Sequence, residues 1–298
     1  MLALGFVACA ESRTLPPAQP APPTITAAVL PGYTLRSNPA IRVEIHAPRV
    51  SAYRAATLGS RTETVELAIG NAGTEPIDLA GAKLSFDVRL GAVRIPCAAR
   101  NDVPKRESPA LQPGQRAVIT RDLCSLPLPG DYAVDARLAL PGHEPEHVGS
   151  FPLTVGAHGP NVPRAVQDQP GLFAALGGDP NGMRFTRREW ESGAYHVMVR
   201  LTNASTVPVH VRRAQVVFHV TRAGHAIGCE SSHDLAPPPE LEPGDSWLSQ
   251  VPVTCLIDVK GRYDIHAAFA TEDEETPLAD LSVEVTSDPL LYLPIIPW

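Results

Sequence analysis

The sequence predicts an all-β fold of two tandem antiparallel β-sandwich domains, and three observations carry this prediction. Segment 64–76 returns as segment 196–208, and the correspondence continues for about ninety residues. Apolar and polar side chains alternate within the matched segments, as in Val65, Leu67 and Ile69. The chain also contains 32 prolines and 22 glycines, many of them between these segments. Period two with one apolar face is typical of half-buried strands, and frequent turn residues exclude long helices.

The two copies keep an almost constant offset, which indicates one common architecture. Three matched pairs are separated by 132 residues (Asn71 with Asn203, Phe86 with Phe218, Cys97 with Cys229) and two by 131 (Cys124 with Cys255, Tyr132 with Tyr263). Several short strands over about 120 residues predict a sheet-on-sheet sandwich with one core in each copy.

Turn motifs give the repeat a resemblance to a known family. Leu111-Gln112-Pro113-Gly114 is followed by Gly130-Asp131-Tyr132, and Leu241-Glu242-Pro243-Gly244 is followed by Gly261-Arg262-Tyr263. This pattern resembles bacterial immunoglobulin-like domains. The resemblance implies that Tyr132 and Tyr263 form tyrosine corners, in which the phenol hydroxyl bonds to the backbone upstream.

Four of the five cysteines form duplicated pairs. Cys97 and Cys124 occupy the same places in the first copy as Cys229 and Cys255 in the second. We therefore expect one disulfide in each domain, although four cysteines formally allow three connectivities. The absence of a Cys-x-x-Cys motif argues against zinc, and disulfides indicate a compartment outside the reducing cytosol.

The fifth cysteine, Cys9, ends a short apolar run. Phe6-Val7-Ala8-Cys9 resembles the lipobox of bacterial lipoproteins, which implies cleavage before Cys9 and lipidation of its thiol. Ala10 after that cysteine resembles an outer-membrane sorting signal. A Pro-rich stretch follows and is expected to be a stiff, solvated spacer. We therefore expect an extracytoplasmic, outer-membrane lipoprotein that faces the periplasm or the cell surface.

The expected organisation has six parts. They are a signal or lipobox remnant (1–9), a disordered Pro/Ala-rich linker (10–37), a first domain (38–157), an interdomain linker (158–170), a second domain (171–287) and an apolar tail (288–298). The tail has two interpretations: it packs on its own domain, or it docks on a partner. Its candidate contact residues are Leu290, Tyr292, Ile295 and Trp298.

Motifs for catalysis are weak in this chain. The net charge of −7, with both signs interspersed, argues against nucleic-acid binding. Segment 143–147 fits His-Glu-x-x-His as text, but Pro145 disfavours the helix that the zinc-protease motif needs. The acidic loops at 143–147 and 271–276 are expected to be solvated hairpin tips, with calcium binding as the alternative. We predict no catalytic residue, no metal site and no cofactor.

The sequence therefore predicts a non-enzymatic cell-envelope protein that binds or presents a surface. Its partner would be an envelope protein or a surface ligand, with the membrane reached through the lipid anchor. One alternative is a proteinase inhibitor of the β-sandwich type, which the Pro-Gly and Gly-x-Tyr pattern also resembles, with segment 103–109 as the inhibitory loop. The other alternative, a metal-dependent hydrolase, needs a site that the sequence does not show.

Overall fold

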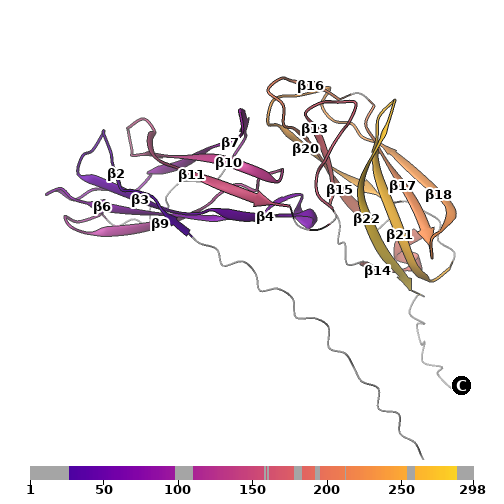
Figure 1. Cartoon of the computed structure of the whole chain (residues 1–298). Coiled ribbons are helices and arrows are strands. Elements are labelled where there is room, and N and C mark those ends of the chain that lie inside the picture. The colour runs from indigo at the N-terminus through magenta and orange to yellow at the C-terminus, as the bar shows by residue number, and fades with distance from the viewer. Residues whose placement is uncertain are drawn as a thin grey trace, which may run out of the picture.

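The chain folds into two β-sandwiches with separate hydrophobic cores (Figure 1). A computed structural model describes residues 27–97, 110–157, 159, 161–177, 183–191, 195–211, 213–253 and 259–286. One core contains buried residues between Leu35 and Val155, and the other contains buried residues between Val166 and Val285. Among the described residues, no helix has the length and apolar character needed to cross a membrane.

The first domain consists of two packed sheets. One sheet has the order β1 (Ala27–Val29), β3 (Ile41–Pro48), β6 (Thr64–Asn71) and β9 (Arg116–Asp122), with β2 (Tyr33–Thr34) also paired to β3. The other has the order β5 (Gly59–Ser60), β4 (Val50–Arg54), β11 (Glu146–Gly156), β10 (Gly130–Ala139), β7 (Lys83–Leu90) and β8 (Val93–Ile95). A 3-10 turn, η1 (Ala55–Thr57), joins β4 to β5.

The second domain repeats this plan. One sheet has the order β12 (Arg164–Ala165), β13 (Leu172–Gly177), β15 (His196–Asn203) and β20 (Ser246–Pro252). The other has the order β14 (Met183–Thr186), β22 (Glu275–Thr286), β21 (Gly261–Ala270), β17 (Gln215–Arg222) and β18 (His225–Asp234). A small ribbon joins β16 (Val209–His210) to β19 (Glu240–Leu241), and α1 (Arg187–Glu191) follows β14.

Both domains share one unusual pairing, which defines their topology. Among the strands that the structure describes, all pairs are antiparallel except β4 with β11 and β14 with β22, which run parallel. In each case the chain leaves the first sheet and crosses to the second, so that an early strand lies beside the last strand of the domain. This crossover and the strand order are those of an immunoglobulin-like sandwich, as the sequence predicted.

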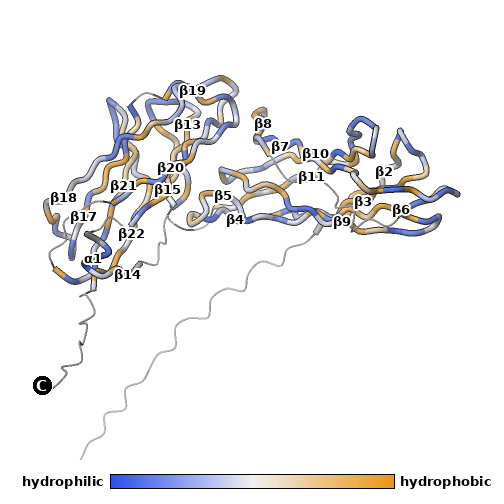
Figure 2. Tube along the Cα trace, turned by 180° about the vertical axis from the view of Figure 1, so that it is seen from behind, coloured by the Kyte–Doolittle hydropathy of each residue, from blue (hydrophilic) through white to orange (hydrophobic). Residues whose placement is uncertain are grey.

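The cores follow from the period-two pattern of the strands. Along β7 the side chains of Leu84, Phe86 and Val88 are buried, while Lys83 and Ser85 are exposed. In Figure 2 the hydrophobic and hydrophilic colours accordingly alternate along the strands of both domains. Each domain therefore buries its own apolar face between its two sheets, and burial of this kind is the main stabilising contribution.

The first predicted disulfide is present, and both tyrosines bond to the backbone upstream. Cys97, after β8, is bonded to Cys124, after β9, with 5.4 Å between their Cα atoms. The buried Tyr132 hydroxyl donates to the Leu128 carbonyl oxygen over 2.7 Å, and the Tyr263 hydroxyl donates to the Val259 carbonyl oxygen. These bonds, each four residues upstream, have the geometry of a tyrosine corner.

The structure corrects two predicted boundaries. The linker expected over 10–37 reaches too far, because β1 and β2 pair with β3, and Leu35 is buried in the first core. The interdomain linker expected over 158–170 is likewise too long, because β12 pairs with β13. The strands β1, β2 and β12 are only two or three residues long, so the alternation of apolar and polar residues in them is too brief to be recognised in a sequence.

The domains meet through one end of the first sandwich and the outer face of the β12-β13-β15-β20 sheet. Arg200 on β15 reaches across and donates to the carbonyl oxygen of Leu58, just after η1. Gly244 lies against Arg94, and a Cβ there would overlap the Arg94 carbonyl oxygen. Tyr53, like Leu58, belongs to the first domain. Burial raises the pKa of Tyr53 to about 12, and the positive charge of Arg200 opposes this rise.

Candidate functional site

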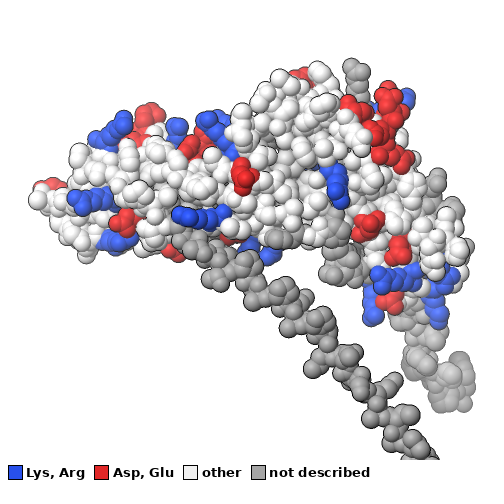
Figure 3. Space-filling model, in the orientation of Figure 1, with Lys and Arg blue, Asp and Glu red and all other residues white. Residues whose placement is uncertain are grey.

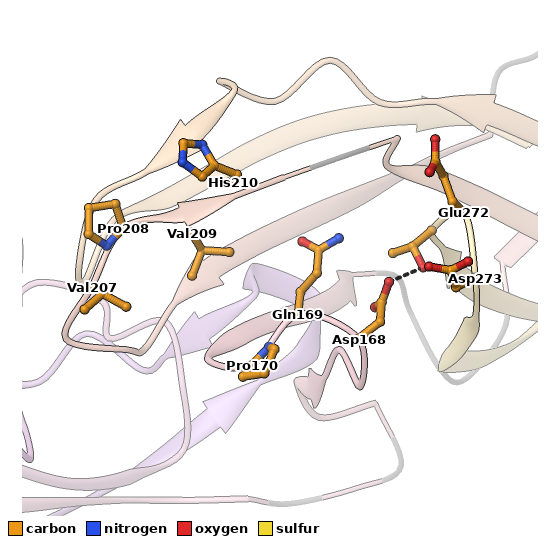
Figure 4. Close-up of a pocket in the computed structure, with 10 residues that line it drawn as sticks. Asp168, Gln169, Pro170, Val207, Pro208, Val209, His210, Glu272 and Asp273 are labelled. Atoms are coloured by element: carbon orange, nitrogen blue, oxygen red, sulfur yellow. Dashed lines mark hydrogen bonds between the residues drawn. The ribbon is translucent and has the colours of Figure 1, made fainter.

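Three loops of the second domain enclose a groove of about 380 Å³ (Figure 4). The first loop joins β12 to β13, the second precedes and includes β16, and the third is the tip of the β21–β22 hairpin. The residues lining the groove are Asp168, Gln169, Pro170, Val207, Pro208, Val209, His210, Thr271, Glu272 and Asp273. Loops carried by a rigid sandwich are where such domains place their binding residues.

A buried asparagine fixes the middle loop. The Asn203 amide donates to the carbonyl oxygens of Val207 and Leu241, over 2.8 Å each, and its oxygen accepts from the Ser205 backbone N–H over 2.8 Å. Asn203 is fully buried at the end of β15, so these bonds form away from water. They hold the chain between Asn203 and Val209 in one conformation, and one wall of the groove is thereby set.

The groove is acidic at one end and apolar at the other. The Thr271 hydroxyl donates to Asp168 over 2.6 Å and so ties the first loop to the third. Glu272 and Asp273 extend from the hairpin tip, where Figure 3 shows acidic side chains gathered. Arg213 lies 3.4 Å from Glu272 and compensates part of this charge. At the other end Val207, 60% exposed, lies beside Pro208.

One buried acceptor in the groove is unused. The Oε1 atom of Gln169 is shielded from solvent, and among the described residues it has no hydrogen-bond partner. Figure 4 shows the Gln169 side chain between His210 and the acidic hairpin tip. The oxygen is too shielded to contact a ligand directly, whereas the carboxylates at the acidic end of the groove favour a ligand that carries hydrogen-bond donors and positive charge.

The equivalent end of the first domain is built differently. Asn71 repeats the frame, since its amide donates to the carbonyl oxygens of Glu75 and Leu111 over 2.8 Å each. However, the Glu146 carboxylate accepts from the backbone N–H groups of Arg36 and Ser37, over 2.7 Å each. Hydrogen bonds from Ser37, then from the backbone of Arg36, lower the pKa of Glu146. The Glu146 carboxylate thus joins the β10–β11 hairpin to the loop between β2 and β3 and closes the gap between these two loops.

Several predicted site residues lie outside the described part of the chain. These are Cys9, Cys255, the segment 103–109, and Leu290, Tyr292, Ile295 and Trp298 of the tail. The Cys229–Cys255 disulfide therefore stays a prediction. Segment 143–147 forms a turn that leads into β11, as expected from Pro145, and not a helix. Among the described residues, no three His, Cys, Asp or Glu side chains are already arranged around a common metal position.

Neither the groove nor the role of the two asparagines that fix the loop ends, Asn203 beside the groove and Asn71 in the first domain, was predicted from the sequence. The signal for the asparagines was present, because Asn71 and Asn203 are matched in the repeat and each follows a strand. A polar residue retained at the buried end of a strand indicates a satisfied hydrogen-bond network. The groove itself gives no sequence signal, since it arises where three distant loops converge.

Comparisons with known proteins do not assign the chain to a family. No protein-family model matches the chain, and no curated protein matches its sequence. Solved structures with related architecture include a red sea bream transglutaminase (14% identity, 84% of this chain and 32% of that one, TM-score 0.24) and fibronectin(III)-like modules of Clostridium thermocellum CbhA (14%, 83% and 94%, 0.21). A Salmonella alpha-2-macroglobulin mutant is similar at 12% identity (83% and 16%, TM-score 0.26).

The chain thus spans about a third of the transglutaminase and a smaller share of the macroglobulin. The class of the protein, a tandem of two immunoglobulin-like β-sandwiches, rests on the strand order and register of its own sheets. Because one sandwich fold serves many unrelated functions, the function has to be argued from the groove and its residues.

Proposed function

We propose that this chain is a non-enzymatic binding module, and that the groove at the loop end of its second domain receives a basic segment of a partner protein. The observation that carries the proposal is the combination of Asp168, Glu272 and Asp273 at one end of the groove with the exposed Val207 at the other. Carboxylates that face a lysine or arginine side chain form charge-assisted hydrogen bonds with it. The exposed Val207 and the neighbouring prolines would contact apolar residues that flank the basic ones.

The rigidity of the groove supports binding by a preformed surface. Asn203 fixes one wall, and the Thr271–Asp168 hydrogen bond joins the other two loops. A surface that is already ordered loses little conformational entropy when a partner binds. The first domain, with its loop end closed by Glu146, would then act as a spacer.

Binding of a labelled peptide tests this proposal. A fluorescein-labelled peptide of repeating Lys-Val-Pro should bind the whole chain, with an affinity that falls as salt increases because charge pairs are screened. Changing both Asp168→Asn and Asp273→Lys should weaken binding by roughly tenfold, the order expected when complementary charges are removed. The matched control is Glu144→Lys at the equivalent tip of the first domain, which should leave binding unchanged. Equal losses in both variants would indicate nonspecific attraction and would reject the groove.

We further propose that the module is displayed on the outer membrane of a bacterial envelope, through a lipid on Cys9. The lipobox-like Phe6-Val7-Ala8-Cys9 and the Pro-rich stretch that follows support this proposal. The Cys97–Cys124 disulfide is consistent with it, because such bonds persist in oxidising compartments. Two acyl chains on one terminus would suffice for stable anchoring.

The anchor is tested separately from the groove. When the protein is expressed in a bacterium from a precursor with a basic segment before Met1, it should fractionate with membranes and enter the detergent phase. Cys9→Ser should block both, while peptide binding by the purified domains is retained. Recovery of the unchanged protein as wholly soluble, with an unmodified Cys9 thiol, would refute the anchor and leave the groove untouched.

A further inference from the structure

Two histidines lie side by side on the outer face of the β14-β22-β21-β17-β18 sheet. His219 on β17 and His266 on β21 are directly opposite each other in the antiparallel register. Their neighbours Phe218 and Ile265 are buried, so both imidazoles point away from the core. Side chains opposite each other in such a pair have Cβ atoms about 5 Å apart. Two imidazoles at this spacing are able to reach a common ion.

Carboxylates accompany both histidines. Asp280 on β22 is opposite His266, and its Oδ1 lies 2.7 Å from the Nδ1 of that ring. The Oε2 of Glu275 lies 3.6 Å from the Nε2 of His219. All four residues line one surface hollow of about 360 Å³. The His219 and His266 side chains are 40% and 52% exposed, so the hollow is open to ions from solution.

The contact between Asp280 and His266 has a specific chemical consequence. When the Nδ1 of His266 carries the proton and donates it to Asp280, the lone pair of Nε2 is available for a metal. A carboxylate behind a ligating imidazole in this way is the usual outer-shell arrangement of metal-binding histidines. Imidazole ligands with one carboxylate suit zinc, copper and nickel, whereas calcium and magnesium prefer oxygen ligands alone.

The first domain lacks this arrangement and serves as an internal control. The repeat offset places Asp87 at the position of His219 and Asp135 at that of His266, and these aspartates are likewise opposite each other. Arg94 and Arg89 lie 3.0 and 3.4 Å from Asp87 and neutralise it. The histidine pair is therefore a property of the second domain and not of the shared frame.

We propose that His219 and His266 form a binding site for a divalent transition-metal ion of the zinc, copper and nickel class. Glu275 would supply a third ligand after a change of rotamer, water would complete the coordination, and Asp280 would position His266. The change of rotamer is needed because, within the described residues, no three such side chains already surround one point. This inference is independent of the proposed partner groove.

Calorimetric titration of the whole chain with zinc chloride, and separately with copper chloride, tests the site. Any free thiol is first blocked with iodoacetamide, so that cysteine does not contribute. One equivalent of ion should bind, and His219→Gln or His266→Gln should weaken that binding at least tenfold. Asp280→Asn should weaken it by roughly tenfold, the order found for outer-shell partners. Magnesium should produce no heat of binding.

A matched control separates this site from the other histidines. The variant with both His143→Gln and His147→Gln, in the turn before β11 and at the start of that strand in the first domain, should bind zinc as the unchanged chain does. In spectra of the ¹⁵N-labelled chain, zinc should shift resonances of β17, β21 and β22. Binding that survives both His219→Gln and His266→Gln, or the absence of any stoichiometric binding, would overturn the proposal.

Discussion

The loop ends of the two domains share one buried asparagine network but differ in the side chains at their tips. Asn71 and Asn203 each hold a loop through the same pair of carbonyl contacts, so the two backbones are positioned alike. In the first domain Glu146 binds backbone N–H groups of the opposite loop and closes that end. In the second domain Asp168 and Asp273 leave a groove. The buried asparagine thus preserves the frame, while the exposed tips are free to diverge.

The largest effect should come from the disulfide of the first domain. Replacing both Cys97→Ala and Cys124→Ala opens a loop of 27 residues, which should lower the free energy of unfolding by about 3.5 kcal/mol. The loss should be confined to the first domain, because the two cores are separate. Hydrogen exchange followed by mass spectrometry resolves the domains. An equal loss of protection in both would contradict the separation of the cores.

The next largest effect should come from the framing asparagines. Asn203→Ala should destabilise the second domain by about 3 kcal/mol, since it removes three hydrogen bonds of a fully buried side chain: two to the carbonyl oxygens of Val207 and Leu241, and one from the Ser205 N–H. Asn71→Ala should cost the first domain a similar amount. Urea unfolding followed by tryptophan fluorescence reports the second domain, because all three tryptophans lie beyond residue 189. A change below about 1 kcal/mol would show that water replaces the amide.

A smaller effect is expected at the junction between the two domains. Gly244→Ala forces a Cβ onto the Arg94 carbonyl and should push the domains apart, whereas Gly114→Ala, its counterpart in the first domain, meets nothing within 4 Å. Both glycines have positive φ, 84° and 75°, so the backbone strain of about 1–2 kcal/mol is common to both variants. Small-angle scattering should therefore change only for Gly244→Ala. Identical curves for the two variants would show that the junction is loose.

The smallest effect should be the acid sensitivity of the closed loop end. Because the folded pKa of Glu146 is lowered, its stabilising contribution is present above the ordinary glutamate value of about 4.3 and is lost as pH falls through the folded value. Glu146→Gln should remove this part of the pH dependence at a cost below about 1 kcal/mol, because the carboxylate is exposed. Thermal melts between pH 3 and 7 measure it. A pH dependence identical to that of the unchanged chain would show that other carboxylates cause it.

Much of the fold was predictable from the sequence, because repetition and alternation are local signals. The Cys97–Cys124 disulfide and the two-sheet architecture followed from them. The groove, the contact of Arg200 with Leu58 and the pairing of His219 with His266 were not predictable. Each depends on register or on loops brought together by the fold, and residues far apart in the chain give no periodic signal of such proximity. His219 alone is an ordinary strand residue until β21 places His266 beside it.

The proposed difference in binding between the two loop ends can be measured by mapping where a ligand binds on the whole chain. The ¹⁵N-labelled protein is titrated with the Lys-Val-Pro peptide, and amide shifts are followed in both domains at once. Shifts are expected at 168–170, 207–210 and 271–273, with none at the equivalent first-domain turns 36–38 and 140–145. Shifts of equal size at both loop ends, or shifts confined to the first domain, would contradict the proposed difference.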